Sequence, residues 1–211
     1  MNNRETLYDG ALSAAWGYLF LNLNISFGRL NILPEFGGYL LLLSAINSWS
    51  VERRDLLLLR PIGKLLVVWS GMDWVMNLIW GISIYELTGL WQFGNLLAGV
   101  AAMYFHFQFL TDSAAIAAEY QAPDGQLDQT ILRRRTWMVV LTTVVMLNIL
   151  LRDWLGDGCF MALAVIRVII GISVVMAMFA LRWELAGDAN PPSDDDTAAP
   201  ALPEKDQTEE Q

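Results

Sequence analysis

Blocks of apolar residues, separated by short polar connections, constrain this chain more than any other feature of its sequence. Hydrophobic residues make up 55% of its 211 residues, and most of them are gathered into runs, as in membrane proteins. A membrane-spanning helix needs about 20 mostly apolar residues, and six segments reach or approach that length. The sequence therefore predicts an all-α, polytopic integral membrane protein with six transmembrane helices. Within a transmembrane domain of residues 1–183, the predicted helices cover residues 12–27, 33–49, 65–85, 90–110, 137–151 and 159–181.

The distribution of basic residues predicts which side of the membrane each connection faces. If the N-terminus is cytoplasmic, ten of the 13 lysines and arginines fall in cytoplasmic segments. Only Arg29 and Arg152 fall outside, and Arg167 lies within the sixth predicted helix. Because cytoplasmic loops of membrane proteins carry such an excess of Lys and Arg, both termini are predicted to be cytoplasmic. Tryptophans near the predicted helix ends fit the same arrangement.

The first two predicted helices leave one alternative open. They could form a re-entrant hairpin that enters and leaves the bilayer on the cytoplasmic side, and the orientation of the other helices would not change. Arg29 lies at the turn of this hairpin. In a re-entrant loop it would lie near the bilayer centre, at a cost of at least about 2.5 kcal/mol, whereas a full hairpin places it in water. Two full spans are therefore favoured.

The connections and the tail carry their own signals. Residues 50–64 either form a short helix on the surface of anionic lipid or are simply the overlapping ends of two helices. Residues 111–136 predict a helix, a turn at residues 123–125 and a second helix, which extend the fourth and fifth helices beyond the bilayer. Residues 152–158, RDWLGDG, predict a tight turn and only weakly a cation site. Residues 184–211 are rich in proline and acids and are predicted to be an acidic, disordered cytoplasmic tail.

Charged and amide side chains within the apolar segments are the candidate functional residues. In the third predicted helix, Ser70, Asp73 and Asn77 share one face. Arg167 lies in the sixth, at a depth that differs from that of Asp73 by about 6 Å at 1.5 Å per residue. Since an unpaired charge is costly in a bilayer, an ion pair between Asp73 and Arg167 is predicted. A structural pair is favoured over a role in ligand or proton handling, and unpaired, water-exposed placement stays a third alternative.

His106 is the only histidine and lies in the fourth predicted helix, beside a row of small residues formed by Gly94, Ala98 and Ala102. Such rows allow helices to pack closely. A lone histidine cannot build a histidine-based metal site, and the single cysteine, Cys159, is expected at the opposite membrane face. No metal or cofactor is predicted. For His106 a hydrogen-bonded packing role is favoured over proton transfer.

The first predicted hairpin contains three further candidate polar residues. Asn22 and Asn24 face nearly opposite sides if this segment is helical, so each needs its own partner; alternatively, the segment is partly unwound and its backbone lines a cavity. Pro34 is suited to the first turn of the second helix, where Glu35 is favoured by the helix dipole. Glu35 could also pair with Arg29 across the loop. Structural roles are favoured for all of these.

Several function classes have no support in the sequence. There is no HExxH, GxSxG or phosphate-binding glycine motif. The acidic tail carries most of the net charge of −9, and no basic patch suggests nucleic-acid binding. One cysteine excludes internal disulfide bonds.

The segment NLNISFGRLNILPEFGGYLLLL resembles a family of uncharacterised multi-pass membrane proteins from Gram-positive bacteria, especially clostridia. Members carry an asparagine-containing apolar run followed by the sequence ILP-acid-F-x-GY, and this chain has NILPEFGGY at that point. The matching residues are Ile32, Leu33, Pro34, Glu35, Phe36, Gly38 and Tyr39. The resemblance covers the N-terminal hairpin only; it implies a bacterial membrane protein and carries no known activity. In size and number of helices, the chain is also similar to the substrate-binding subunits of energy-coupling-factor vitamin transporters.

The function favoured by these observations is a non-enzymatic component of a bacterial cytoplasmic (plasma) membrane. It would be either a subunit that binds or transports a small solute or an accessory protein that binds another membrane protein. The sequence leaves the question of enzymatic activity open, because a membrane-embedded enzyme acting on lipid or peptide is an alternative, as is a regulatory or scaffold protein. The expected partners are the lipid bilayer, a small solute or a membrane protein, and no nucleic acid.

Overall fold

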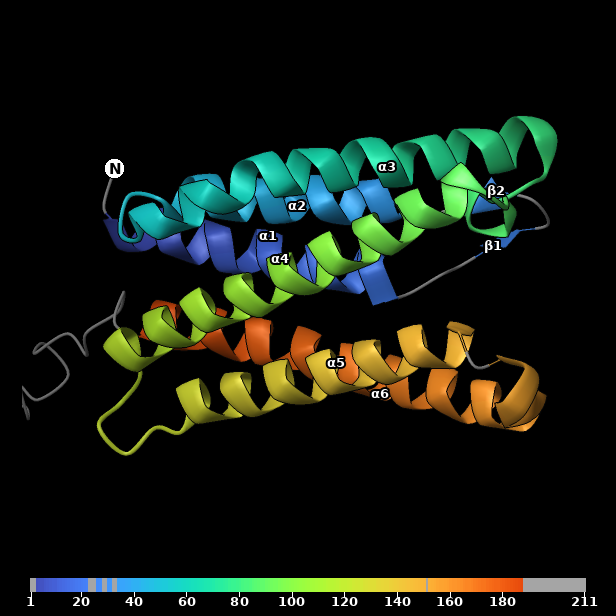
Figure 1. Cartoon of the computed structure of the whole chain (residues 1–211). Coiled ribbons are helices and arrows are strands. Elements are labelled where there is room, and N and C mark those ends of the chain that lie inside the picture. Colours follow the sequence, from blue (N-terminus) through green and yellow to red (C-terminus); the bar gives the residue numbers. More distant parts are fainter. Residues whose placement is uncertain (1–2, 23–25, 28–29, 32–33, 151, 188–211) are drawn as a thin grey trace, which may run out of the picture.

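The computed structural model describes residues 3–22, 26–27, 30–31, 34–150 and 152–187. In the described part of the chain, long helices account for nearly all of the regular structure, and two short strands pair antiparallel between the first two helices (Figure 1). The elements are α1 (Asn3–Asn22), β1 (Ser26–Phe27), β2 (Leu30–Asn31), α2 (Glu35–Trp49), the 3₁₀ helix η1 (Arg54–Leu58), α3 (Leu59–Trp80), the 3₁₀ helix η2 (Ile84–Glu86), α4 (Leu90–Tyr120), α5 (Leu127–Leu150) and α6 (Arg152–Gly187).

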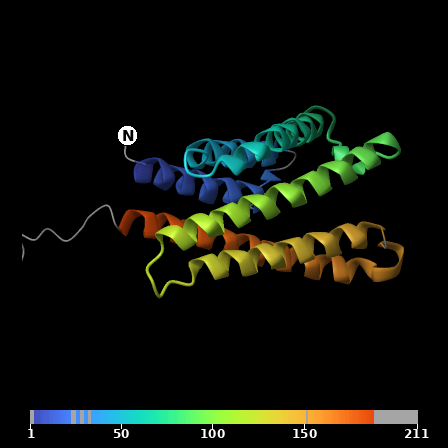
Figure 2. The same ribbon diagram turned by 60° about the vertical axis from the view of Figure 1, so that its left-hand side comes forward.

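The helices run back and forth along one direction. α1, α2 and α3 lie side by side, α5 and α6 form a second group, and α4 crosses between the two groups (Figures 1 and 2). α1 also packs along α6, and α4 packs mainly against α5. The start of α1, the α2–η1 junction, the α4–α5 connection and the end of α6 lie at one end of the bundle (Figure 1). We call this the N-terminal end, and the end with η2 the opposite end.

Small residues allow α1 and α2 to pack closely. A Cβ atom on Gly38 would lie 2.9 Å from the carbonyl oxygen of Gly17, and one on Gly17 would lie 3.0 Å from the carbonyl oxygen of Gly38. The two backbones therefore touch where no side chain could fit. α3 ends at Gly81, whose φ of 69° is the left-handed conformation that glycine adopts without strain.

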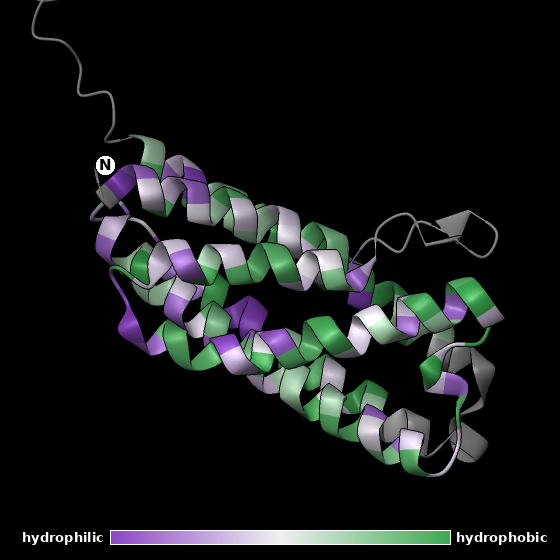
Figure 3. Cartoon of the chain, turned by 90° about the horizontal axis from the view of Figure 1, so that it is seen from above, coloured by the Kyte–Doolittle hydropathy of each residue, from purple (hydrophilic) through white to green (hydrophobic). Residues whose placement is uncertain are grey.

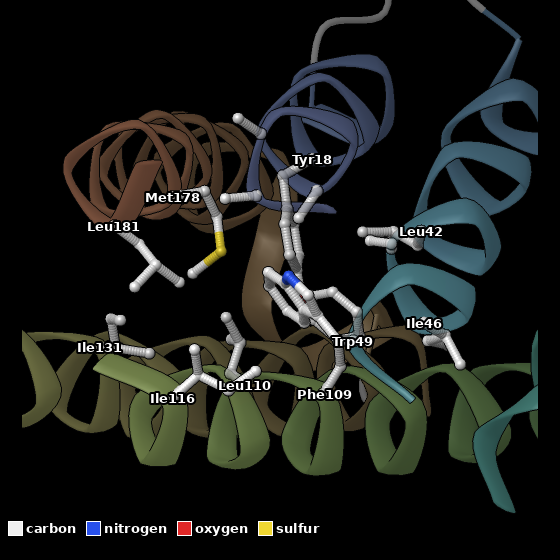
Figure 4. Packing of buried hydrophobic residues seen from close by; sticks show 14 of the residues in the cluster. Tyr18, Leu42, Ile46, Trp49, Phe109, Leu110, Ile116, Ile131, Met178 and Leu181 are labelled. Atoms are coloured by element: carbon white, nitrogen blue, oxygen red, sulfur yellow. The ribbon is translucent and has the colours of Figure 1, made fainter. Parts of the chain in front are cut away.

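The buried core is concentrated towards the N-terminal end. Trp49 of α2 is fully buried beside Tyr18 of α1 and Phe109 of α4 (Figure 4). Its indole Nε1 donates a hydrogen bond of 3.0 Å to the carbonyl oxygen of Leu7. Burial of so large an aromatic side chain contributes more to stability than burial of most other core residues. Because Trp49 of α2 contacts both α1 and α4, it holds three helices together at this end.

Much of the outer surface of the helices is apolar. Figure 3 shows hydrophobic residues along the helices, and large side chains such as Val68, Trp80 and Ile169 are more than half exposed. Soluble monomers rarely expose contiguous apolar surface on this scale. Among the described residues, three helical segments are long and apolar enough to cross a membrane: Arg54–Trp80, Leu90–Tyr120 and Met161–Ala186.

The other helices differ from the predicted six spans in ways that the structure explains. α2 has only 15 residues, which rise about 22 Å, less than the roughly 30 Å of a bilayer core. α1 begins at Asn3 rather than at residue 12 and so includes Arg4, Glu5 and Asp9. The first half of α5 contains three consecutive arginines. Membrane association is thus supported by three helices, while the six-span arrangement stays a prediction.

The connections between helices can be compared directly with their predictions. The predicted helix–turn–helix at residues 111–136 is confirmed, because α4 continues to Tyr120 and α5 begins at Leu127. The predicted turn at residues 152–158 is wrong, because this segment is the first part of α6. Each glycine costs a helix only about 1 kcal/mol, which the packing of a 36-residue helix against α1 and α5 offsets. Residues 50–64 contain η1 and the first turns of α3, which agrees with the predicted overlap of helix ends; placement of this segment on a lipid surface stays a prediction.

Candidate functional site

A large cavity lies within the bundle, towards the opposite end from the core. Its volume is about 1070 Å³, and its lining includes residues from each of the helices α1 to α6. The walls are mainly apolar and aromatic, with Trp69 and Met138 among them. A cavity of this size and composition, with a few polar groups, is typical of a small-molecule site.

Four of the seven candidate residues line this cavity: Asn22, Glu35, His106 and Arg167. They come from α1, α2, α4 and α6, so only the tertiary structure brings them together. Asp73 and Asn77 do not belong to the lining, and Asn24 lies outside the described residues.

Asp73 is bonded to the loop that follows its own helix. Its Oδ1 accepts a hydrogen bond of 2.7 Å from the hydroxyl of Ser83 and one of 2.8 Å from the backbone N–H of Ile84. The amide of Asn95 on α4 donates to the carbonyl of Ile84 at 3.0 Å. Together these bonds attach η2 to α3 and α4.

The predicted ion pair between Asp73 and Arg167 is therefore wrong: these two described residues form no ion pair within 4.0 Å. Asp73 and Arg167 lie at similar depths along their helices, but similar depth does not bring two side chains together unless their helix faces also point toward each other. Ser83 and Ile84 satisfy the Asp73 carboxylate with neutral donors instead, which is a common way to stabilise a partly buried carboxylate.

Two carboxylates, Glu35 and Glu86, line the cavity together with Arg167. Glu35 lies in the first turn of α2, directly after Pro34, and its charge interacts with that of Arg167. Neither side chain forms an ion pair within 4.0 Å with any described residue. The predicted partner of Glu35, Arg29, lies outside the described residues. Among these charged groups, Glu35 and Arg167 interact across space but are not directly paired.

His106 lies among aromatic rings. Its ring stacks on Tyr39 with centroids 5.8 Å apart, and Phe105 meets it edge-on. Its Nδ1 is 3.4 Å from the hydroxyl oxygen of Tyr18, a long hydrogen bond whose direction depends on the tautomer. This arrangement agrees with the favoured packing role, although His106 is also among the residues that line the cavity.

Asn22 joins α1 to α6. Its Nδ2 donates to the carbonyl of Tyr18 in the same helix at 2.7 Å, and its side chain fills the space beside Gly171 of α6. Asn22 therefore has a neighbour on another helix, as its position predicted.

Sequence reasoning missed the tyrosines of the cavity. Tyr18, Tyr39 and Tyr85 all line it. For Tyr39 a signal was present, because it follows Glu35 by four residues and must share its helix face. For Tyr85 there was none, because its position depends on the loop that Asp73 holds.

Two buried polar atoms of the lining residues have no hydrogen-bond partner among the residues that the structure describes: the indole Nε1 of Trp69 and the Oδ1 of Asn95. Within the described ranges, no group of three His, Cys, Asp or Glu side chains is placed to hold a metal ion. The arrangement therefore offers hydrogen bonds, opposite charges and aromatic faces to a bound molecule.

Three comparisons, with protein-family models, with curated proteins and with solved structures, each find no match to this chain.

Proposed function

We propose that this protein is a multi-pass component of a bacterial cytoplasmic membrane that binds a small solute within its helical bundle, as a binding or transport subunit. The observation that carries the proposal is the cavity of about 1070 Å³, which Glu35, His106 and Arg167 line together. A charged side chain inside a membrane protein is costly and usually marks a substrate pathway or a binding site. In this proposal six helices cross the membrane, and both termini are cytoplasmic.

The distribution of charge supports this orientation. Nine basic residues from Arg4 to Arg182 lie towards the N-terminal end of the bundle, which the positive-inside rule assigns to the cytoplasm. Residues of the loop after η2, such as Thr88 and Gly89, line the cavity at the other end. The cavity then opens towards the outer face of the membrane.

The lining also indicates the chemistry of the solute. Arg167 would bind a carboxylate or another oxyanion, and Glu35 would bind an amine or a hydroxyl donor. Tyr39 and Tyr85 offer aromatic faces to an apolar or planar part of the molecule. A small solute with both an acidic group and a donor group fits these features best.

A membrane-embedded enzyme is the second candidate, because Glu35 and His106 line the same cavity and are residue types that transfer protons. The two functions differ in outcome: a binding or transport subunit returns its solute unchanged, whereas an enzyme converts it.

The first experiment tests whether water reaches the cavity. In a Cys159→Ser background, a single cysteine is placed at Ala102, which lines the cavity, or at Val100, which is exposed on the outside of the same helix and does not line it. A membrane-impermeant thiol reagent, added to intact cells, should modify Ala102→Cys much faster than Val100→Cys. Equal and slow modification of both, with rapid modification of Thr88→Cys, would contradict an outward-open cavity.

The second experiment tests binding. A panel of small zwitterionic solutes is screened for compounds that raise the unfolding temperature of the purified protein. Any such shift should be lost in Glu35→Gln and Arg167→Gln and kept in Asp124→Asn, which changes an exposed residue outside the cavity. Shifts that persist in both cavity variants would place the solute elsewhere.

A further inference from the structure

A second, separate pocket lies near the N-terminal end of the bundle. It has a volume of about 410 Å³ and is lined by Leu43 and Asn47 of α2 and by Arg60 and Lys64 of α3. None of these residues lines the central cavity. The pocket lies in the first two turns of α3, directly after η1.

The two cations of this pocket have no anionic partner in the described part of the chain. Arg60 and Lys64 are four residues apart and so share one face of α3, where two like charges repel. Neither forms an ion pair within 4.0 Å with a described residue. In addition, the Nε of Arg60 is buried and makes no hydrogen bond within the described structure. A buried N–H group without an acceptor is unfavourable, and this one stands beside an open pocket with a second positive charge.

The surroundings of the pocket are apolar. Leu58 of η1 is 72% exposed, and Leu65 and Val68 continue an exposed apolar row along α3. On α2, Leu40 is half exposed and lies two turns before Asn47 on a similar face. The two cations thus lie beside the exposed apolar residues of η1 and α3, with the single exposed Leu40 on α2.

We propose that this pocket binds the headgroup of an anionic phospholipid, with phosphate oxygens accepting hydrogen bonds from Arg60 and Lys64 and acyl chains lying along the exposed apolar residues of η1 and α3. Basic pockets between membrane helices bind anionic headgroups in this way. The guanidinium of Arg60 and the ammonium of Lys64 supply the donors for the phosphate oxygens. With the proposed orientation, the lipid belongs to the cytoplasmic leaflet. This assignment of the leaflet rests on the proposed function, whereas the pocket itself does not depend on it.

The test uses the full-length protein purified in detergent, with phosphatidylglycerol and phosphatidylcholine of identical acyl chains as probes. Native mass spectrometry measures how much of each lipid stays bound. The wild-type protein should retain phosphatidylglycerol in preference to phosphatidylcholine. Arg60→Gln should weaken phosphatidylglycerol binding by about tenfold, equivalent to about 1.4 kcal/mol, and Arg133→Gln, which removes an exposed arginine outside the pocket, should not.

Two further variants keep the test decisive if Arg60→Gln folds poorly. Lys64→Gln changes an exposed side chain and should also weaken phosphatidylglycerol binding. Arg60→Lys keeps the charge but removes Nε–H, so an intermediate affinity is expected.

Three outcomes would overturn the proposal. Equal retention of both lipids would show that the headgroup charge is not recognised. Equal losses in Lys64→Gln and Arg133→Gln would show a diffuse charge effect rather than a site. Displacement of phosphatidylglycerol by inorganic phosphate at equal concentration would assign the pocket to free phosphate.

Discussion

Asp73 shows how a carboxylate in an apolar helix can be satisfied without an opposite charge. Its position on the polar face of the third helix predicted a polar partner, and the structure supplies two, Ser83 and Ile84. Both follow within eleven residues in the chain, so the partner was local and the predicted Arg167 was not involved. For the residues of the cavity, by contrast, the neighbours are distant in the chain. Glu35 and Arg167 were predicted as separate candidates, and they share a site only because of how α2 and α6 are placed.

At the scale of single residues, we predict that Asp73→Ala lowers the free energy of unfolding by about 1–3 kcal/mol, because the buried N–H of Ile84 loses its acceptor. Asp73→Asn keeps an oxygen acceptor and should cost less. Arg167→Leu should not restore the stability of Asp73→Ala, and thermal unfolding in detergent measures all three. Restoration by Arg167→Leu would mean that the two charges do interact directly.

Among the elements, the contact of α1 with α6 joins the first group of helices to the second. Gly171 of α6 is buried against Asn22 of α1, and a Cβ atom at this position would overlap the Asn22 side chain. Gly171 follows Arg167 by four residues and so shares its helix face, but the sequence does not identify α1 as the neighbour. The break between α4 and α5 was predictable because Pro123, Asp124 and Gly125 are local turn residues.

At the scale of elements we predict that Gly171→Ala lowers the free energy of unfolding by about 1–3 kcal/mol, the usual cost of overpacking. Gly71→Ala is the matched control: its nearest neighbour would be 4.0 Å away, so the higher helix propensity of alanine should leave stability unchanged or raise it. Adding Asn22→Ala to Gly171→Ala should restore only part of the lost stability, since the Cβ atom of residue 22 stays 2.9 Å from the added methyl group. Equal effects of the two glycine substitutions in thermal unfolding would argue against a close α1–α6 contact.

The helical bundle is tightly packed towards the N-terminal end and contains the cavity towards the opposite end. Trp49 and Phe109 belong to the packed end, and the cavity occupies the other. The packed end also carries most of the basic residues. A protein built in this way can hold its helices together near one membrane face while a solute enters from the other.

For the whole molecule we predict that the α3–α4 connection faces outwards and the α4–α5 connection faces the cytoplasm. In the Cys159→Ser background, Thr88→Cys should react with an impermeant thiol reagent in intact cells. Asp124→Cys should react only after the cells are permeabilised. Reaction of both without permeabilisation, or the opposite pattern, would contradict the proposed orientation.

The sequence by itself determined the helical class, the apolar surface that suits a membrane and the local events along the chain, such as the helix break at Pro123. These depend on residue type and on spacing within one segment, which a sequence displays directly. It could not determine that Glu35 and Arg167 share a cavity, that Asp73 is excluded from it, or that Arg60 and Lys64 border a pocket. Those facts depend on the rotation of each helix about its axis and on which helices are neighbours. Only the packing of side chains such as Asn22 against Gly171, and of Gly17 against Gly38, decided them.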